Sequence, residues 1–213
     1  MTNTARTLAL LLAVAAGAAC RTAGPGSGAP LMQPGAPGQP GRSISTAAAT
    51  DLSKVAFSPA DVVFMQGMIG HHAQALDMVV LIADRTQRQD MKLLGKRIEL
   101  SQADEIGMMR TWLRERGQEA PSEHAHHAHD YKLMPGMLSP DEMAALAAAK
   151  GPEFDRLFLE GMIKHHGGAL TMVDELLKSP GAAQESDIYS FVSDIVADQQ
   201  MEIDRMRAML TVR

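Results

Sequence analysis

Apolar residues recur in steps of three and four along most of the chain after residue 57, which is the spacing of one buried face of an α-helix. No segment alternates apolar and polar residues as a half-buried strand does. A short helix is expected between Ser139 and Gly151. The pattern predicts an all-α domain with long helices over about 59–85, 89–116, 152–178 and 184–211.

Capping and turn residues set the limits of these helices. Ser58 precedes Pro59 and Asp61, which is the composition of an N-cap followed by a first helical turn. Gly117 ends the second long helix, and the sequence Ser-Pro-Gly at 179–181 ends the third, because glycine and proline favour leaving a helix.

One segment of the chain occurs twice. Residues 61–79 recur 94 positions later as residues 155–173, with eleven of nineteen positions identical. We therefore predict two related helical hairpins, 57–116 and 152–213, that pack as a four-helix bundle. The segment 117–151 would form the crossover and carry the short helix.

The repeat carries adjacent histidines inside an apolar face. His71 and His72 in the first copy correspond to His165 and His166 in the second. A buried imidazole is costly unless its ring nitrogens are satisfied, so a duplicated pair needs a chemical explanation. The bundle would bring these histidines together with other residues of the helix seams, namely Gln102, Glu105, Gln199, Glu202, Met68, Met78, Met109, Met162, Met172 and Met206.

Two chemistries could satisfy this set of residues. In the first, Glu105 and Glu202 accept hydrogen bonds from the histidines, and the network only fixes the helix register. In the second, the histidines, methionines and glutamates are metal ligands or orient those ligands. The second interpretation is favoured because the set is duplicated and rich in methionine.

The ligand types select among metals. A di-iron bundle needs Glu-x-x-His on two helices, whereas Glu105 and Glu202 are followed at that spacing by Met108 and Arg205. Imidazole with thioether suits copper, and the thioether favours Cu(I). The 16 methionines against eight aromatic residues point the same way, although methionine also fills helical cores without any metal.

A second candidate metal site lies in the crossover. His124, His126, His127 and His129 fall within six residues, with an acidic residue on either side. A polar loop of this composition can wrap a divalent ion, so we expect it to bind copper, with zinc as another candidate. Such tracts also bind transition metals adventitiously, which is the alternative to a biological purpose.

The N-terminus predicts export. Residues 1–20 hold Arg6, an apolar run too short to span a bilayer, and then small residues. Cys20 follows Gly-Ala-Ala and resembles the lipidated cysteine of a bacterial lipoprotein, the alternative being an ordinary signal-peptidase site. Residues 21–50 are rich in Gly, Pro, Ala and Ser and predict a disordered linker before one domain at 51–213.

The charge of the domain narrows its partners. Residues 51–213 hold 17 basic and 25 acidic side chains, a net charge of −8. This sign argues against nucleic acid and anionic lipid as partners and favours cations. A lipid on Cys20 would still anchor the chain to a membrane, and a homo-oligomer is compatible with the sequence.

Three motifs together resemble a known family. They are Gly-Met-Ile-x-His-His-x-x-Ala-Leu-x-Met in both copies of the repeat, Gln-x-x-Glu-Ile-x-x-Met at 102–109 and 199–206, and Met-Pro-Gly-Met at 134–137. They are similar to the CopM-like family of exported ferritin-like helical proteins, long catalogued as a domain of unknown function. The resemblance covers nearly all of 57–210. It implies a ferritin-like four-helix fold and, for members with an assigned role, copper binding and copper tolerance in the bacterial envelope.

Three functions are compatible with these observations. The leading hypothesis is an envelope protein that sequesters copper, with the core histidines and methionines as ligands and the crossover histidines as a capture site. The second is a copper oxidase acting on Cu(I) or a small reductant, although a role without turnover is favoured. The third is a metal-free structural bundle whose buried histidines only set the packing.

Overall fold

The computed structural model describes residues 31–33, 40–50, 56–122 and 132–211. The chain divides into two units, Met1–Leu52 and Ser53–Arg213, and each is described by itself. The second unit holds the repeated segment and every candidate metal ligand that the structure describes.

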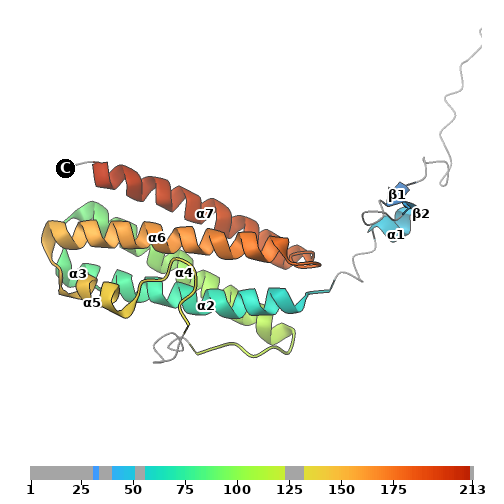
Figure 1. The fold of residues 1–213 in the computed structure, drawn as a ribbon, viewed down its shortest axis with the longest axis horizontal. Helices are drawn as coiled ribbons and strands as arrows, with labels where there is room; N and C mark the ends of the chain where they lie inside the picture. The colour runs from blue at the N-terminus through green and yellow to red at the C-terminus, as the bar shows by residue number, and fades with distance from the viewer. Residues whose placement is uncertain (1–30, 34–39, 51–55, 123–131, 212–213) are drawn as a thin grey trace, which may run out of the picture. The chain divides into compact units, whose positions relative to one another are not determined.

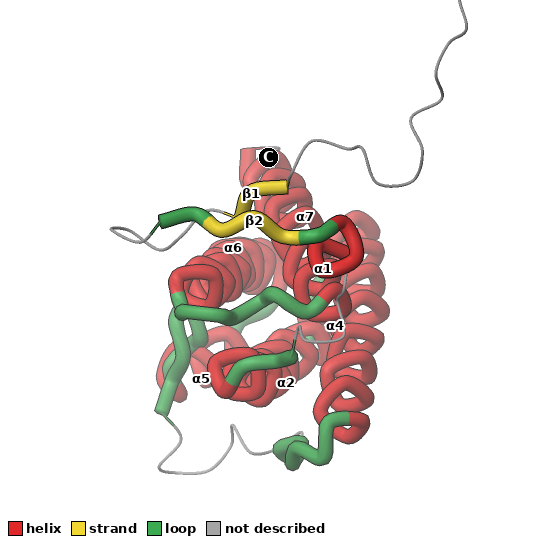
Figure 2. The backbone as a smooth tube through the Cα atoms, turned by 90° about the vertical axis from the view of Figure 1, so that its right-hand side faces the viewer, coloured by secondary structure: helices red, strands yellow, loops and turns green. Residues whose placement is uncertain are grey.

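The second unit is helical throughout its described elements, which confirms the predicted mainly helical fold (Figure 1). Helix α2 packs along α4, α6 packs along α7, and the two hairpins meet through α2 and α6 (Figure 2). Helix α5 lies in the crossover against α6. The elements are α2 (Pro59–Val80), α3 (Ile82–Arg85), α4 (Gln89–Glu115), α5 (Pro140–Ala148), α6 (Gly151–Lys178) and α7 (Ser186–Thr211).

The predicted N-cap of the first helix is confirmed. The Ser58 hydroxyl accepts a hydrogen bond from the Asp61 backbone N–H, and the Asp61 carboxylate accepts one from the Ser58 N–H, which forms a capping box. The helix does not run unbroken to Arg85 as predicted, because a turn at Leu81 separates α3 from α2. After this turn Ile82 packs directly against Gly95 of α4, where a Cβ would lie 2.4 Å from Ile82 Cδ1.

The core of the second unit consists of two apolar clusters with a polar layer between them along the helices. One cluster contains Met68, Met109 and Met172, and the other contains Met78, Met162 and Met206. On each long helix the buried polar residues of this layer lie between a residue of one cluster and a residue of the other. They are His71, His72, Gln102, Glu105, His165, His166, Gln199 and Glu202. The six methionines expected around the histidines therefore lie three on each side of the polar layer.

A segment of the crossover, Met134–Leu138, crosses the contact between α2 and α6, and we call it the strap. The Gln74 side chain on α2 donates to the Leu138 carbonyl at 2.9 Å and accepts from the Leu138 N–H at 2.8 Å. Gly136 has φ +76°, and a Cβ there would lie 2.5 Å from the Lys164 carbonyl oxygen of α6. Gly168 leaves the complementary space on α6, since a Cβ there would overlap the Pro135 carbonyl.

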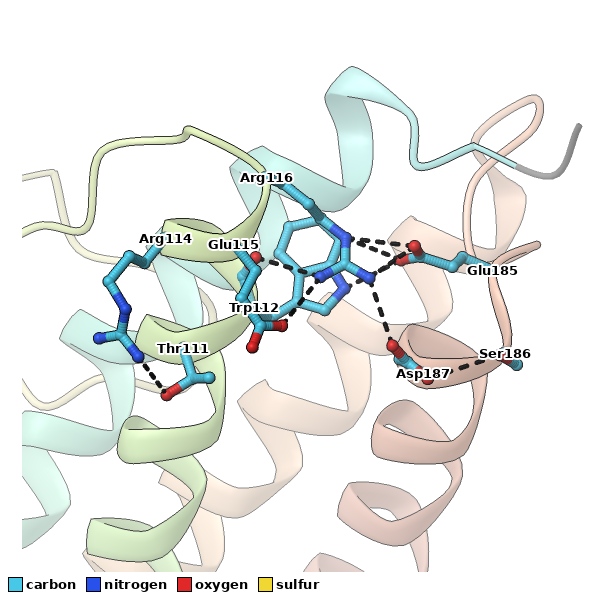
Figure 3. A network of polar contacts seen from close by, with 8 residues as sticks. All are labelled: Thr111, Trp112, Arg114, Glu115, Arg116, Glu185, Ser186 and Asp187. Atoms are coloured by element: carbon cyan, nitrogen blue, oxygen red, sulfur yellow. Dashed lines mark hydrogen bonds and ion pairs between the residues drawn. The ribbon is translucent and has the colours of Figure 1, made fainter. Parts of the chain in front are cut away.

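A network of polar contacts joins the end of α4 to the start of α7 (Figure 3). The Arg116 guanidinium lies 4.4 Å from the centre of the Trp112 ring and contacts both oxygens of Glu185. The Trp112 indole N–H donates to Glu185 Oε2 at 3.0 Å, and Arg116 also reaches Asp187 at 3.3 Å. This network ties the first hairpin to the second at one end.

The first unit contains a small hairpin and one helical turn. Strand β1 (Leu31–Gln33) pairs antiparallel with β2 (Arg42–Ile44), with Leu31 opposite Ile44, and helix α1 (Thr46–Thr50) follows. These elements lie in the segment predicted as a disordered linker, so its described part has local secondary structure. None of the residues of α1 is buried. Nowhere in the described chain is a helix both long enough and apolar enough to span a bilayer.

Candidate metal centre

The four repeated histidines lie together in the polar layer. His71 and His72 come from α2, His165 and His166 come from α6, and all four side chains are fully buried. The rings of His71 and His165 face each other with centroids 3.9 Å apart and an interplanar angle of 40°. The pseudo-equivalent histidines of the two repeats therefore meet where the hairpins pack.

His71 and His165 each use Nε2 on a backbone carbonyl. His71 Nε2 donates to the Pro135 carbonyl of the strap at 3.0 Å, and His165 Nε2 donates to the His71 carbonyl at 2.9 Å. The two histidines are equivalent in sequence but not in partner, because the strap covers only one of them. The sequence did not indicate the Pro135 carbonyl, which lies 64 residues from His71.

The second histidine of each repeat is paired with a glutamate. His72 Nε2 lies 2.5 Å from Glu105 Oε2 on α4, and His166 Nε2 lies 2.6 Å from Glu202 Oε2 on α7. The glutamate of each Gln-x-x-Glu motif thus contacts the second histidine of the same hairpin. These contacts are compatible with both interpretations of the set, a packing network and a layer of oriented ligands.

The hydrogen-bond partners fix the tautomer of two of the histidines. A carbonyl can only accept, so Nε2 of His71 and of His165 carries the proton, and the neutral ring of each has its lone pair on Nδ1. No described residue forms a hydrogen bond to the Nδ1 atoms of His71, His72, His165 and His166. Four buried ring nitrogens without hydrogen-bond partners are expected of a metal-binding layer, whereas a pure packing network would satisfy them.

Burial keeps the His71 and His165 rings neutral. Desolvation, followed by the charge of His72, lowers the pKa of His71 to about 3. Desolvation, followed by the charge of His71, holds the pKa of His165 well below its ordinary value. At neutral pH both rings are in the unprotonated form that binds metals.

Met68, Met109, Met162 and Met206 lie one helical turn from a histidine or glutamate of the layer, whereas Met78 and Met172 lie about two turns from the histidines. Met68 and Met162 precede the two histidine pairs by three and four residues, on the same helix face. Met172 of α6 reaches α2, where its Cε would lie 3.5 Å from a Cβ on Gly67. The other predicted methionines, Met78, Met109 and Met206, are fully buried in the two clusters.

The two glutamines of the layer have unused polar atoms. Gln102 lacks partners for both its amide nitrogen and its amide oxygen, and Gln199 lacks one for its oxygen, among the described residues. Sequence reasoning missed Gln74, which holds the strap over His71. The signal was the asymmetry of the repeat, since Gln74 stands where the second copy has Gly168.

Among the described residues, histidine, cysteine and carboxylate side chains alone do not form a metal site. No group of three or more His, Cys, Asp or Glu side chains in the described ranges is close enough to hold one ion. The donors that adjoin the histidines in this layer are the methionine thioethers, and imidazole with thioether is a soft ligand set. The crossover histidines, His124, His126, His127 and His129, and the predicted lipidation site Cys20 lie outside the described residues.

These features define a helical protein with a buried layer of histidines between methionine-containing clusters. A family model described as "Domain of unknown function (DUF305)" matches residues 61–210. The chain belongs to this family. Comparison with curated protein sequences finds no match.

Solved structures support the assignment. A DUF305 fragment from Deinococcus radiodurans is 32% identical over 72% of this chain and 97% of its own, with a TM-score of 0.61. A DUF305 protein from Streptomyces coelicolor is 27% identical over 71% and 91% of the two chains, with a TM-score of 0.61. CopM in its Cu(I)-bound form is 27% identical over 70% and 94%, with a TM-score of 0.55. The resemblance to the CopM-like family, expected from the motifs, is confirmed.

Proposed function

We propose that the protein binds copper in the buried histidine layer and sequesters it in the bacterial envelope. The observation that carries this proposal is the set of four buried Nδ1 atoms that lack any hydrogen-bond partner. An acceptor buried without a partner costs on the order of 1–3 kcal/mol. A duplicated set of such acceptors is most simply explained by a ligand that the lone pairs bind.

The chemistry of the donors favours copper. Histidines that bind metals usually donate their other ring N–H to a carboxylate or a carbonyl, and all four Nε2 atoms do so here. His71 and His165, joined by thioethers of the adjoining clusters, would offer Cu(I) a soft donor set. Solved structures of CopM hold Cu(I), Cu(II) or silver, which is the metal preference expected of such donors.

We infer the surrounding organisation from the sequence. The two hairpins would form a ferritin-like four-helix bundle within a domain at 51–213, preceded by a linker and an export signal at 1–20. Acylation of Cys20 would anchor the chain, and the crossover histidines would capture divalent copper or zinc. The S. coelicolor relative is described as a candidate secreted protein, which supports export.

Two double variants test the proposal against a purely structural role. His71→Leu/His165→Leu removes two ligands but strands only backbone carbonyls, so apo stability should stay level while Cu(I) affinity falls at least tenfold. His72→Leu/His166→Leu strands the carboxylates of Glu105 and Glu202, so apo stability should fall. Protein without a His tag is titrated with Cu(I) against a competing chelator and melted without metal.

The metal-free bundle is the second candidate, and the two His–Glu pairs favour it because they resemble a register-fixing network. It predicts unchanged Cu(I) affinity in the first variant and, in the second variant, a loss of apo stability with Cu(I) affinity again unchanged. A copper oxidase differs from both by consuming oxygen in the presence of Cu(I), and we expect no turnover.

A further inference from the structure

A hollow of about 300 Å³ opens on the surface between α4 and α7, beside the histidine layer. Ser101, Asp104 and Glu105 line it from α4, and Asp194 and Asp198 line it from α7. No lysine or arginine is among the described residues that line it. The charged side chains of the hollow are therefore all acidic, and they include the carboxylate that contacts His72. Apolar side chains complete the lining, namely Met108, Phe191, Ile195 and Ala197.

The two glutamates of the repeat differ in their access to solvent. Glu202 is closed off, since Arg97 lies across it with Nε 3.4 Å from Oε1, and its side chain is only 2% exposed. Glu105 has no such cover, and its side chain lines the acidic hollow while 8% exposed. One His–Glu pair is thus sealed and the other faces an open, negatively charged hollow.

The floor of the hollow has unused acceptor capacity. Glu105 Oε2 contacts His72, but Glu105 Oε1 has no hydrogen bond or ion pair with any described residue. Gln102, one turn earlier on α4, is fully buried, and neither of its amide atoms has a partner in the described chain. A nearly buried carboxylate that lines a recess with other carboxylates, and with no basic side chain among the described lining residues, is unfavourable unless a cation visits it.

A second observation agrees with this crowding of negative charge. Burial, followed by the charges of Glu105 and Glu202, raises the pKa of Asp198 against the smaller opposing effect of the Arg97 charge. Asp198 therefore lies within the field of both layer carboxylates.

We infer that the hollow is the uptake site at which a hydrated metal cation binds before it reaches the histidine layer through Glu105 and His72. This inference rests on the proposed copper-binding function and adds the route by which the metal would reach the histidine layer. No three of these carboxylates are close enough to coordinate one ion directly, so the cation keeps its water and is held through it. Six waters occupy about 180 Å³ at about 30 Å³ each, which the hollow accommodates.

The physical basis is electrostatic focusing. A recess lined by one sign of charge raises the local concentration of counter-ions and speeds their association by about 10- to 1000-fold at low ionic strength. The structure provides such a recess on the Glu105 side, whereas the Arg97 guanidinium lies against the Glu202 carboxylate.

The test compares Asp194→Asn/Asp198→Asn with the matched control Asp84→Asn/Asp174→Asn, which removes the same charge from exposed positions on α3 and α6. Full-length protein is titrated with Mn²⁺, which prefers oxygen ligands, and paramagnetic broadening of backbone amide signals is followed. Broadening should centre on Ser101, Asp104 and Ala197 in wild type and control. In the hollow variant it should need at least tenfold more Mn²⁺.

A second measurement follows uptake into the layer. Ag⁺ is mixed with protein at low salt, quenched with excess chelator, and the retained metal is counted against time. Retention should slow about tenfold in the hollow variant and reach the same final amount, with the control unchanged. Asp194→Lys should slow it further.

The two measurements separate the possible failures. Broadening that avoids the hollow, or that the hollow variant leaves unchanged, overturns the inference whatever the uptake rate. Broadening at the hollow with equal retention rates overturns its role in uptake. If wild-type protein retains no metal at all, the proposed function fails, and the uptake role falls with it.

Discussion

The imidazole rings of His71 and His165 lie with their centroids 3.9 Å apart, at the contact between the two repeats. Each ring donates its Nε2 proton to a backbone carbonyl, and each leaves Nδ1 without a hydrogen-bond partner among the described residues. Both rings are neutral because they are buried. At neutral pH each ring can therefore bind a metal cation through Nδ1 but does not take up a proton there.

Acid should destabilise the metal-free protein. The pKa of His71 is lowered to about 3, so the unfolded chain takes up a proton first as pH falls. The stability that depends on a neutral His71 ring is complete above the pKa of the unfolded chain, about 6.5, and it is lost as pH falls toward 3. From pH 7 to pH 5 His71 alone should remove about 2 kcal/mol from the free energy of unfolding. His165 adds in the same direction.

Urea unfolding at a series of pH values measures this slope. In His71→Leu the slope between pH 5 and 7 should be shallower than in wild type, since one buried titrating group is gone. Identical slopes would mean that the His71 ring is protonated to the same extent in the folded and unfolded chains.

The strap should depend on Gly168 but not on its neighbour. A Cβ at Gly168 would overlap the Pro135 carbonyl, so Gly168→Ala should displace the strap and cost about 1–3 kcal/mol or more. Gly167→Ala meets nothing within 4 Å and should stabilise α6 by about 0.5–1 kcal/mol. Thermal melting of both variants checks the pair, and equal effects would argue against the close approach of strap and helix.

The Glu185 carboxylate should stabilise the end of the hairpin contact. It binds both the Arg116 guanidinium and the Trp112 indole N–H, and it is largely buried (Figure 3). Glu185→Ala should cost about 1–3 kcal/mol. Glu115→Ala, whose contact with Arg116 is 3.9 Å and exposed, should change stability by less than about 0.5 kcal/mol. Chemical denaturation compares the two.

The glutamate behind His72 should tune copper affinity. Glu105→Gln keeps an acceptor for the His72 N–H but removes the negative charge that raises the basicity of the ring. Cu(I) affinity should fall about 10- to 100-fold, with little change in apo melting. Glu99→Gln, an exposed position beside Lys96, is the control and should bind Cu(I) as wild type does. Unchanged affinity in Glu105→Gln would remove this glutamate from the account.

The sequence predicted the helices well where local signals set them. The capping boxes at Ser58 and Ser139 follow directly from residue types at fixed spacing. The turn at Leu81 could not be predicted, because it depends on the packing of Ile82 against Gly95 on another helix. Burial of the histidines followed from periodicity, since four apolar neighbours recur with them on one face.

The partners of the histidines were not available from the sequence. Which ring nitrogen meets the Pro135 carbonyl depends on how the crossover lies over α2 and α6, a long-range feature. The pairing of Glu105 with His72 rather than His71 likewise depends on helix rotation. The repeat suggests that Glu105 and Glu202 have equivalent surroundings, but of these two glutamates Arg97 contacts only Glu202. The open hollow beside Glu105 therefore could not be predicted from the sequence.

The nitrogen spectrum of the buried histidines tests the central claim most directly. Protein labelled with ¹⁵N at histidine is titrated with Ag⁺, a redox-inert substitute for Cu(I) whose nuclear spin couples to directly bound nitrogen. We predict that the Nδ1 signals of His71 and His165 shift and split on binding, while their Nε2 atoms stay protonated and hydrogen-bonded. Bound silver that leaves these Nδ1 signals unchanged would contradict the account and place the metal outside the buried layer.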